Sequence, residues 1–178
     1  MNKISLKRVV LSGIMVALVF LATYFTRIPI PMTQGYFNVG DTVIIVAAIM
    51  LGKRSGFLIG SMGSFLADVM SGYYLFAPLT LIVKGLEGYM IGSIASSYGD
   101  KKPTESKKIL AILAGVLVMV AGYFIGEATV LKLFDETFGM AAAVYELPLN
   151  LLQGGLSAIL GYSLSTVLTR MGLTADNI

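Results

Sequence analysis

Long apolar stretches separated by short polar ones dominate the chain. A helix needs about 20 mainly apolar residues to cross the hydrocarbon core of a bilayer, and three uncharged stretches come close to this length. Two shorter ones flank Lys53 and Arg54, and a sixth is long enough but carries Lys84 and Glu87 in its interior. We therefore predict an all-α bundle of six transmembrane helices. They cover residues 9–26, 42–52, 55–67, 75–97, 109–126 and 147–169.

Lysine and arginine collect on one side of this predicted bundle. If both chain ends lie on the same side, that side receives ten of these residues, and the other receives only Arg27 and Lys132. Short cytoplasmic loops carry the excess of Lys and Arg. We therefore predict that both termini are cytoplasmic (N-in/C-in) and that residues 1–178 form one multi-pass domain in the cell membrane. The ten are Lys3, Lys7, Arg8, Lys53, Arg54, Lys101, Lys102, Lys107, Lys108 and Arg170.

The composition agrees with a membrane protein and excludes several kinds of chemistry. Hydrophobic residues make up 56% of the chain and charged residues 13%, against about 25% charged in soluble domains. The chain has no Cys and no His, so cysteine nucleophiles, thiolate metal sites and the commonest general base are missing. We expect no enzyme activity, metal or cofactor. The sequence has no basic stripe with interleaved aromatics, so nothing in it predicts nucleic-acid binding. The turn at residues 52–55 lacks the Walker A spacing for ATP.

Small residues repeat every four positions inside the apolar stretches. This spacing places them on one helix face, where two backbones can approach closely. Packing within the chain is the simplest interpretation, and Gly13 with Ala17 has a second one, a smooth face for docking a partner membrane protein. The repeats are Gly13/Ala17, Gly56/Gly60/Ser64, Gly88/Gly92, Gly122/Gly126 and Ser157/Gly161/Ser165.

Polar residues at membrane depth are the candidate substrate-binding groups. A charge near the bilayer centre costs about 2.5–3.5 kcal/mol on insertion scales, so it needs a partner or a purpose. Lys84 and Glu87 share a helix face and can pair, and a structural ion pair remains an alternative for them. The charged residues at membrane depth include more acids than lysines, and this excess of negative charge favours a neutral or protonatable ligand. The candidates are Asn38, Asp41, Asp68, Lys84, Glu87, Tyr123, Glu127, Glu146, Asn150 and Gln153.

Aromatic residues of the outer loops are expected to close over these polar groups or to anchor the chain at the membrane interface. They are Tyr36, Phe37, Tyr73, Tyr74 and Phe76.

Several motifs together resemble the substrate-binding S component of energy-coupling-factor (ECF) vitamin transporters, over essentially the full length. They are the first helix with Gly13 and Ala17, FNVGD at 37–41, ADVMSGY at 67–73, KGLEG at 84–88 and LPLNLLQ at 147–153. The chain looks most like the hydroxymethylpyrimidine and pyridoxine branch, with pantothenate and riboflavin carriers as neighbours. The absence of Trp argues against a thiamine carrier.

The resemblance implies a mechanism. An S component binds its vitamin from outside, in a pocket under the first loop. It then docks through its first helix, here with Gly13 and Ala17, on a transmembrane coupling subunit driven by two ATPase subunits, and topples to deliver the ligand inward.

Two other functional classes remain open at this stage. A stand-alone secondary transporter could couple to protons through Glu127 or Glu146. A membrane-embedded enzyme is disfavoured by the missing His and Cys.

Overall fold

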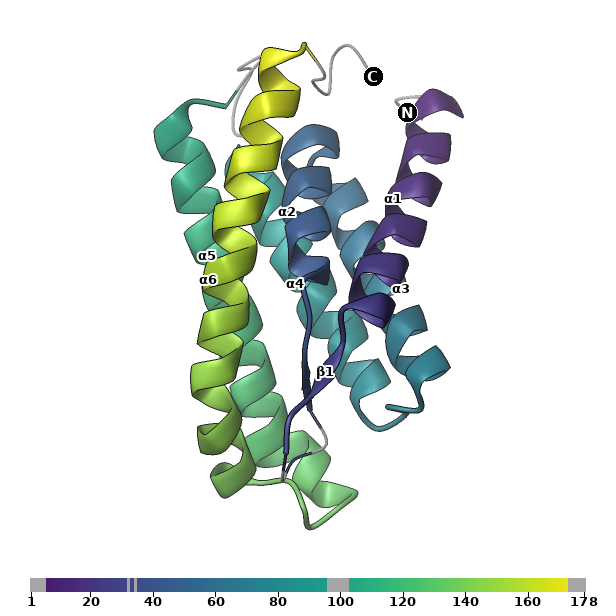
Figure 1. Cartoon of the computed structure of the whole chain (residues 1–178), viewed down its shortest axis with the longest axis vertical. Helices are drawn as coiled ribbons and strands as arrows, with labels where there is room; N and C mark the ends of the chain where they lie inside the picture. The colour runs from purple at the N-terminus through teal and green to yellow at the C-terminus, as the bar shows by residue number, and fades with distance from the viewer. Residues whose placement is uncertain (1–5, 32, 34, 96–102, 173–178) are drawn as a thin grey trace.

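The computed structural model describes residues 6–31, 33, 35–95 and 103–172. The described residues form six α-helices and one short β-hairpin (Figure 1). The helices are α1 (Leu6–Phe25), α2 (Gly40–Leu51), α3 (Lys53–Ser71), α4 (Phe76–Ala95), α5 (Glu105–Ile125) and α6 (Met140–Arg170). The strands β1 (Ile28–Pro29) and β2 (Tyr36–Phe37) pair antiparallel between α1 and α2. The predicted number of helices is therefore confirmed.

Proline explains one helix boundary and fails to set another. Helix α1 ends before Pro29, whose ring removes a backbone donor and suits the edge of the hairpin. Helix α6, in contrast, begins at Met140 and continues through Pro148. Glu146, predicted at the start of this helix, lies inside it. The prediction was wrong because a membrane helix tolerates the single lost backbone bond of a proline when its neighbours support it.

The chain after α5 also departs from the prediction. A π-helical turn (η1, Gly126–Val130) and a short 3₁₀ turn (η2, Leu131–Leu133) follow directly on α5. Glu127, predicted as the end of the fifth helix, therefore lies within the π-helical turn.

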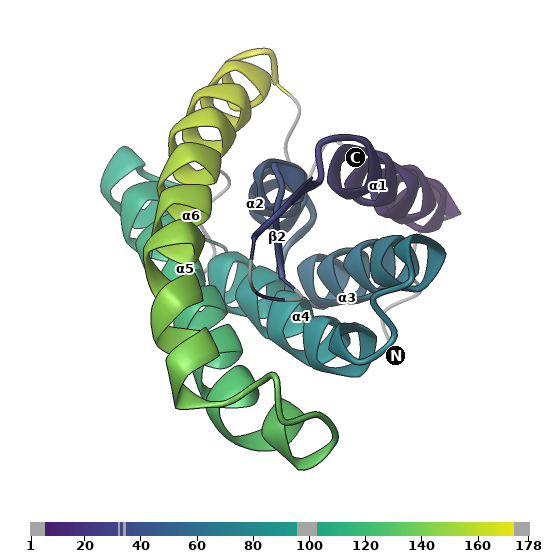
Figure 2. The ribbon, with the colours of Figure 1, turned by 60° about the horizontal axis from the view of Figure 1, so that its bottom comes forward.

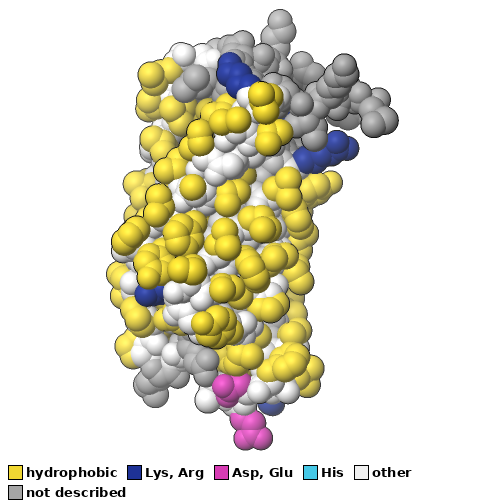
Figure 3. All heavy atoms as spheres, turned by 90° about the vertical axis from the view of Figure 1, so that its right-hand side faces the viewer, with side chains coloured by type: hydrophobic (Ala, Val, Ile, Leu, Met, Phe, Trp, Pro, Cys, Tyr) yellow, Lys and Arg dark blue, Asp and Glu magenta, His cyan; other side chains and the backbone are white. Residues whose placement is uncertain are grey.

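Three helical stretches are long and apolar enough to cross a membrane, namely Leu6–Phe25, Glu105–Leu133 and Met140–Arg170. Helix α2 is apolar but shorter. Hydrophobic side chains cover most of the face in Figure 3, with scattered Lys and Arg side chains and with Asp and Glu near the lower end. Elsewhere on the molecule, Leu117 on α5 and Leu152 on α6 are also exposed. An apolar exterior of this extent suits contact with lipid.

Helix α2 is the centre of the bundle (Figure 2). It contacts α1, α3, α4 and α6, and every residue from Ile44 to Leu51 is buried. A helix that is hydrophobic all round belongs inside a bundle. This central position lets the start of α2 face a cavity between the surrounding helices.

Glycines allow α3 and α4 to pack backbone against backbone. A Cβ on Gly56 would meet the backbone of Gly88, and a Cβ on Gly88 would meet the backbone of Gly56. Gly60 lies in the same way against the carbonyl of Lys84. The small-residue prediction of packing within the chain is confirmed for this pair of helices.

Gly13 and Ala17 behave differently from the other small residues. Both are exposed on the outside of α1, and a Cβ on Gly13 would meet no atom within 4 Å. No described part of the chain packs on this face.

The helix ends that carry most basic residues lie together. Helix α1 begins and α6 ends at the same end of the bundle (Figure 1). There the Arg8 guanidinium donates to the Leu51 carbonyl at 2.7 Å, at the negative end of the α2 dipole. Lys108 pairs with Glu105 at 3.1 Å, and Glu105 accepts from Tyr162 at 2.9 Å, which ties α5 to α6. Lys3, Lys101 and Lys102 lie outside the described residues.

Candidate functional site

A polar cavity lies under the hairpin, in the half of the bundle away from the basic ends. Its volume is about 30 Å³, which is room for about two water molecules. The lining comes from α1, the segment 35–38, α3, α4, α5 with its π-helical turn, and α6. The residues are Thr23, Gly35, Tyr36, Asn38, Ser64, Asp68, Phe76, Thr80, Lys84, Tyr123, Glu127, Glu146, Asn150 and Gln153.

Lys84 is the buried cation of this cavity. Its ammonium contacts the carboxylate of Asp41 on α2 and lies 3.3 Å from that of Glu87, one turn along α4. The ammonium also lies 5.4 Å from the ring centre of Tyr123. All three charged side chains are at most 3% exposed. The predicted pairing of Lys84 with Glu87 is confirmed, and Asp41 is a second partner that the sequence spacing did not indicate.

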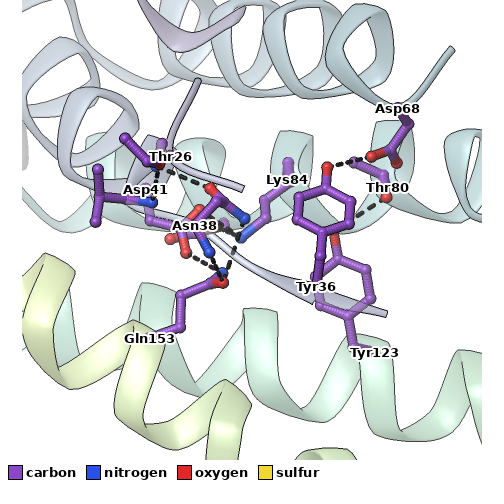
Figure 4. A network of polar contacts seen from close by, with 12 residues as sticks. Thr26, Tyr36, Asn38, Asp41, Asp68, Thr80, Lys84, Tyr123 and Gln153 are labelled. Atoms are coloured by element: carbon purple, nitrogen blue, oxygen red, sulfur yellow. Dashed lines mark hydrogen bonds and ion pairs between the residues drawn. The ribbon is translucent and has the colours of Figure 1, made fainter. Parts of the chain in front are cut away.

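Gln153 joins the hairpin segment to the same network (Figure 4). Its Nε2 donates to the Asp41 carboxylate at 2.8 Å. Its Oε1 accepts from the backbone N–H of Asn38 at 2.9 Å and from the Asn38 side chain at 3.2 Å. One amide on α6 therefore fixes both the start of α2 and the end of the hairpin, and it has no capacity left for a ligand at its oxygen.

Aromatic residues close the opposite side. The Tyr36 hydroxyl donates to Asp68 on α3, and the Tyr36 ring lies 4.7 Å from that of Tyr73. Tyr123 donates to Thr80 at 3.1 Å. Asp68 is 1% exposed, so it is buried under the hairpin rather than wetted at the membrane surface. Tyr36 and Phe76, two of the outer aromatics, thus line this side of the cavity.

Two carboxyl groups meet at the third side of the cavity. Glu127 from the π-helical turn and Glu146 from α6 both line this side of the cavity, and their carboxyl groups interact electrostatically. The Glu146 carboxyl lies directly against Gly35, where a Cβ would meet its oxygens, and the Gly35 backbone N–H donates to Thr33 Oγ1 at 3.2 Å. A π-helical turn re-aims the residues within it and is common at functional sites. Here it brings Glu127 into the cavity.

Most of the predicted substrate-binding residues lie around this one cavity, and two of them lie outside its lining. Eight of the ten line the cavity. Asp41 and Glu87 do not; they lie behind Lys84 and neutralise it. Their placement supports the structural ion pair rather than direct contact with a solute.

Four lining residues were not predicted from the sequence. Ser64 and Thr80 each lie one helical turn before a predicted residue, Asp68 and Lys84, so the same periodicity could have found them. Thr23 and Gly35 carry no such signal, because a lone threonine or a loop glycine is common in membrane proteins.

Comparison with known families decides what kind of protein contains this site. Residues 3–170 match the family described as the ECF-type riboflavin transporter, S component. The chain belongs to this family. S components are the substrate-binding subunits of transporters and are not enzymes. Membership of this transporter family, together with the apolar helices, makes the chain a multi-pass protein of the cell membrane. The resemblance seen in the sequence is confirmed.

Two relatives cover nearly the same length as this S component. A Pyrococcus woesei protein, described as an uncharacterized protein in the gap 3' region, is 36% identical over 155 residues, which are 85% of this chain and 95% of the relative. The thiamine precursor transporter HmpT of Lactococcus lactis subsp. cremoris is 29% identical over 174 residues, which are 97% of this chain and 94% of HmpT.

Proposed function

We propose that this S component binds one small B-type vitamin or vitamin precursor in the polar cavity under the hairpin. The carrying observation is that eight separately predicted polar residues meet in one buried space. A pocket with a few convergent polar groups is typical of a small-molecule site. The similarity to HmpT, a thiamine precursor transporter, favours a hydroxymethylpyrimidine-type ligand. The sequence motifs favour the pyridoxine class as well, with pantothenate and riboflavin as alternatives.

The site binds its ligand after the hairpin segment moves. A cavity of about 30 Å³ holds about two water molecules and is too small for a pyrimidine ring. Gly35, Tyr36 and Asn38 form its cover, and side-chain bonds hold that cover to α3 and α6. Displacement of this segment opens the space between the helices from the outer side.

The topology that goes with this function has six membrane-spanning helices and both termini in the cytoplasm, in one domain over residues 1–178. Arg8 near the start of α1 and Arg170 at the end of α6 lie at the shared end of the bundle (Figure 1) and support the orientation, because cytoplasmic loops carry the excess of Lys and Arg.

Transport requires partners, and α1 offers them a surface. We expect the exposed Gly13 and Ala17 to dock on a transmembrane coupling subunit that works with two ATPase subunits. Small residues let another helix approach closely.

Gly13→Trp is therefore expected to abolish vitamin uptake in cells that contain the coupling module, while the purified variant binds its ligand like the wild type. Gly155→Trp on α6 is the matched control, since a Cβ on Gly155 also meets no atom within 4 Å. Normal uptake by Gly13→Trp would show that this face is not the docking surface.

Asn150→Ala is expected to weaken ligand binding about tenfold at unchanged thermal stability. Asn150 lines the cavity and makes no hydrogen bond to another described residue, so its amide is available to the ligand. The loss corresponds to one hydrogen bond, measured by calorimetric titration of the detergent-solubilised chain. Gln153→Ala serves for comparison and should lower the melting temperature, because it removes bonds within the protein. A destabilised Asn150→Ala variant that binds normally would assign Asn150 a structural role.

Mass spectrometry of small molecules that co-purify with the chain tests the proposed function itself. We expect a pyrimidine, a pyridine or another B-type vitamin in near-stoichiometric amount, and calorimetric titration with the same compound should confirm one site. No co-purified compound together with no binding of any B-type vitamin would contradict the proposal.

The paired acids keep one alternative function open for testing. Glu127 and Glu146 interact in a partly enclosed cavity, which is an arrangement that could also carry a proton in a stand-alone secondary transporter.

A further inference from the structure

The pair of acids at the third side of the cavity has acceptor atoms without donors. Both carboxyl oxygens of Glu127 and one oxygen of Glu146 have no hydrogen-bond partner in the part of the chain that the structure describes. Glu127 is 1% exposed and Glu146 is 3% exposed, and both line the cavity. A buried acceptor without a donor is costly. A hydrogen-bond donor from outside the described chain would therefore stabilise the two carboxyl groups.

The charged side chains near Glu127 and Glu146 do not supply this donor. Among the described residues, Lys84 is the only basic one that lines the cavity, and its ammonium is already engaged by Asp41 and Glu87. Asp68 adds another carboxylate, with one oxygen that has no donor among the described residues. The described lining therefore sets three carboxyl groups, those of Asp68, Glu127 and Glu146, against one cation that is already paired.

The geometry points to a specific subsite: we propose that Glu127 and Glu146 together bind an amino or ammonium group of the ligand. This inference rests on the proposed function and names the ligand class, a small heteroaromatic compound with an exocyclic amine or a protonated ring nitrogen. A charge-assisted hydrogen bond is stronger than a neutral one, and such a group donates to both acids at once. A carboxylate ligand such as pantothenate finds no matching donor at this end.

Paired pyrimidines and paired variants test the subsite by calorimetric titration of the full chain in detergent. The probes are 4-amino-5-hydroxymethyl-2-methylpyrimidine and the same compound without the 4-amino group. We expect the wild type to prefer the amino compound by about ten- to a hundredfold, as for a hydrogen bond to a charged group. Glu127→Gln should reduce that preference at least tenfold, because its amide donates to Glu146 and satisfies the acid internally.

Glu136→Gln is the matched control. It removes the same charge from an exposed position in the loop between η2 and α6, and it should leave both affinities unchanged. Thermal stability of Glu127→Gln should equal or exceed that of the wild type, since the change relieves two facing acids; this separates a ligand contact from a structural role. Glu146→Gln should reduce the preference in the same direction.

The outcomes separate this inference from the proposed function. If Glu127→Gln keeps the wild-type preference for the amino compound, the subsite assignment is wrong and the vitamin-binding function stands. The same holds if the wild type binds pantothenate or riboflavin with affinities that Glu127→Gln leaves unchanged. If the wild type binds neither pyrimidine nor pyridoxine, pantothenate or riboflavin, both proposals fall.

Discussion

Lys84→Met is expected to lower the melting temperature of the detergent-solubilised chain by about 6–20 °C and to weaken ligand binding. Lys84 is 3% exposed and neutralises Asp41 and Glu87, which are 1% and 0% exposed. Loss of one partner leaves uncompensated buried charge, which costs about 3–5 kcal/mol, and each kcal/mol shifts the melting temperature by about 2–4 °C at this chain length. Thermal unfolding followed by circular dichroism measures the effect.

A triple variant makes this prediction specific to charge. Asp41→Asn, Lys84→Met and Glu87→Gln together leave no buried charge in the cluster, and such neutral replacements often cost little. The triple variant should therefore be more stable than Lys84→Met alone, by at least half of the lost melting temperature. Wild-type stability of the single variant would contradict the assignment of Lys84 as the compensating cation.

Gly88→Val is expected to prevent α3 and α4 from packing and to leave little folded protein. A Cβ at this position meets the backbone of Gly56, and a backbone cannot move aside as a flexible side chain does. Overpacking of a core costs about 1–3 kcal/mol or more, and here both helices also carry cavity residues, Asp68 and Lys84. Size-exclusion profiles and the yield of monodisperse protein measure the result.

Gly155→Val is the control for this prediction. It makes the same change of residue on α6, where a Cβ meets no atom within 4 Å, and its yield should match the wild type. A monodisperse Gly88→Val variant that binds ligand would show that α3 and α4 do not need the close approach.

Hydropathy and charge predicted the helices and most of the site because membranes restrict both strongly. Charged residues in apolar stretches are rare, so Lys84, Glu127 and Glu146 stood out without any structural information. Their spacing also placed Asn150 and Gln153 on the same face of one helix as Glu146, and all five line the cavity.

Contacts between distant segments were beyond local patterns. Nothing in the sequence indicated that Gln153 would hold Asn38, because the two are 115 residues apart. The role of Asp41 as a partner of Lys84 depends on how α2 sits inside the bundle. Pro148 misled the helix assignment because its effect depends on neighbouring helices rather than on the residue itself.

Reconstitution of the purified chain alone in liposomes tests the central claim most directly, that the buried polar groups bind a vitamin while separate subunits supply the work. The measurement is the uptake of radiolabelled vitamin with an acid-outside pH gradient and without ATP. The S-component assignment predicts that retained label never exceeds about one molecule per chain and does not respond to the gradient. Accumulation beyond that amount, abolished by a protonophore or by Glu127→Gln, would contradict it and identify a proton-coupled transporter.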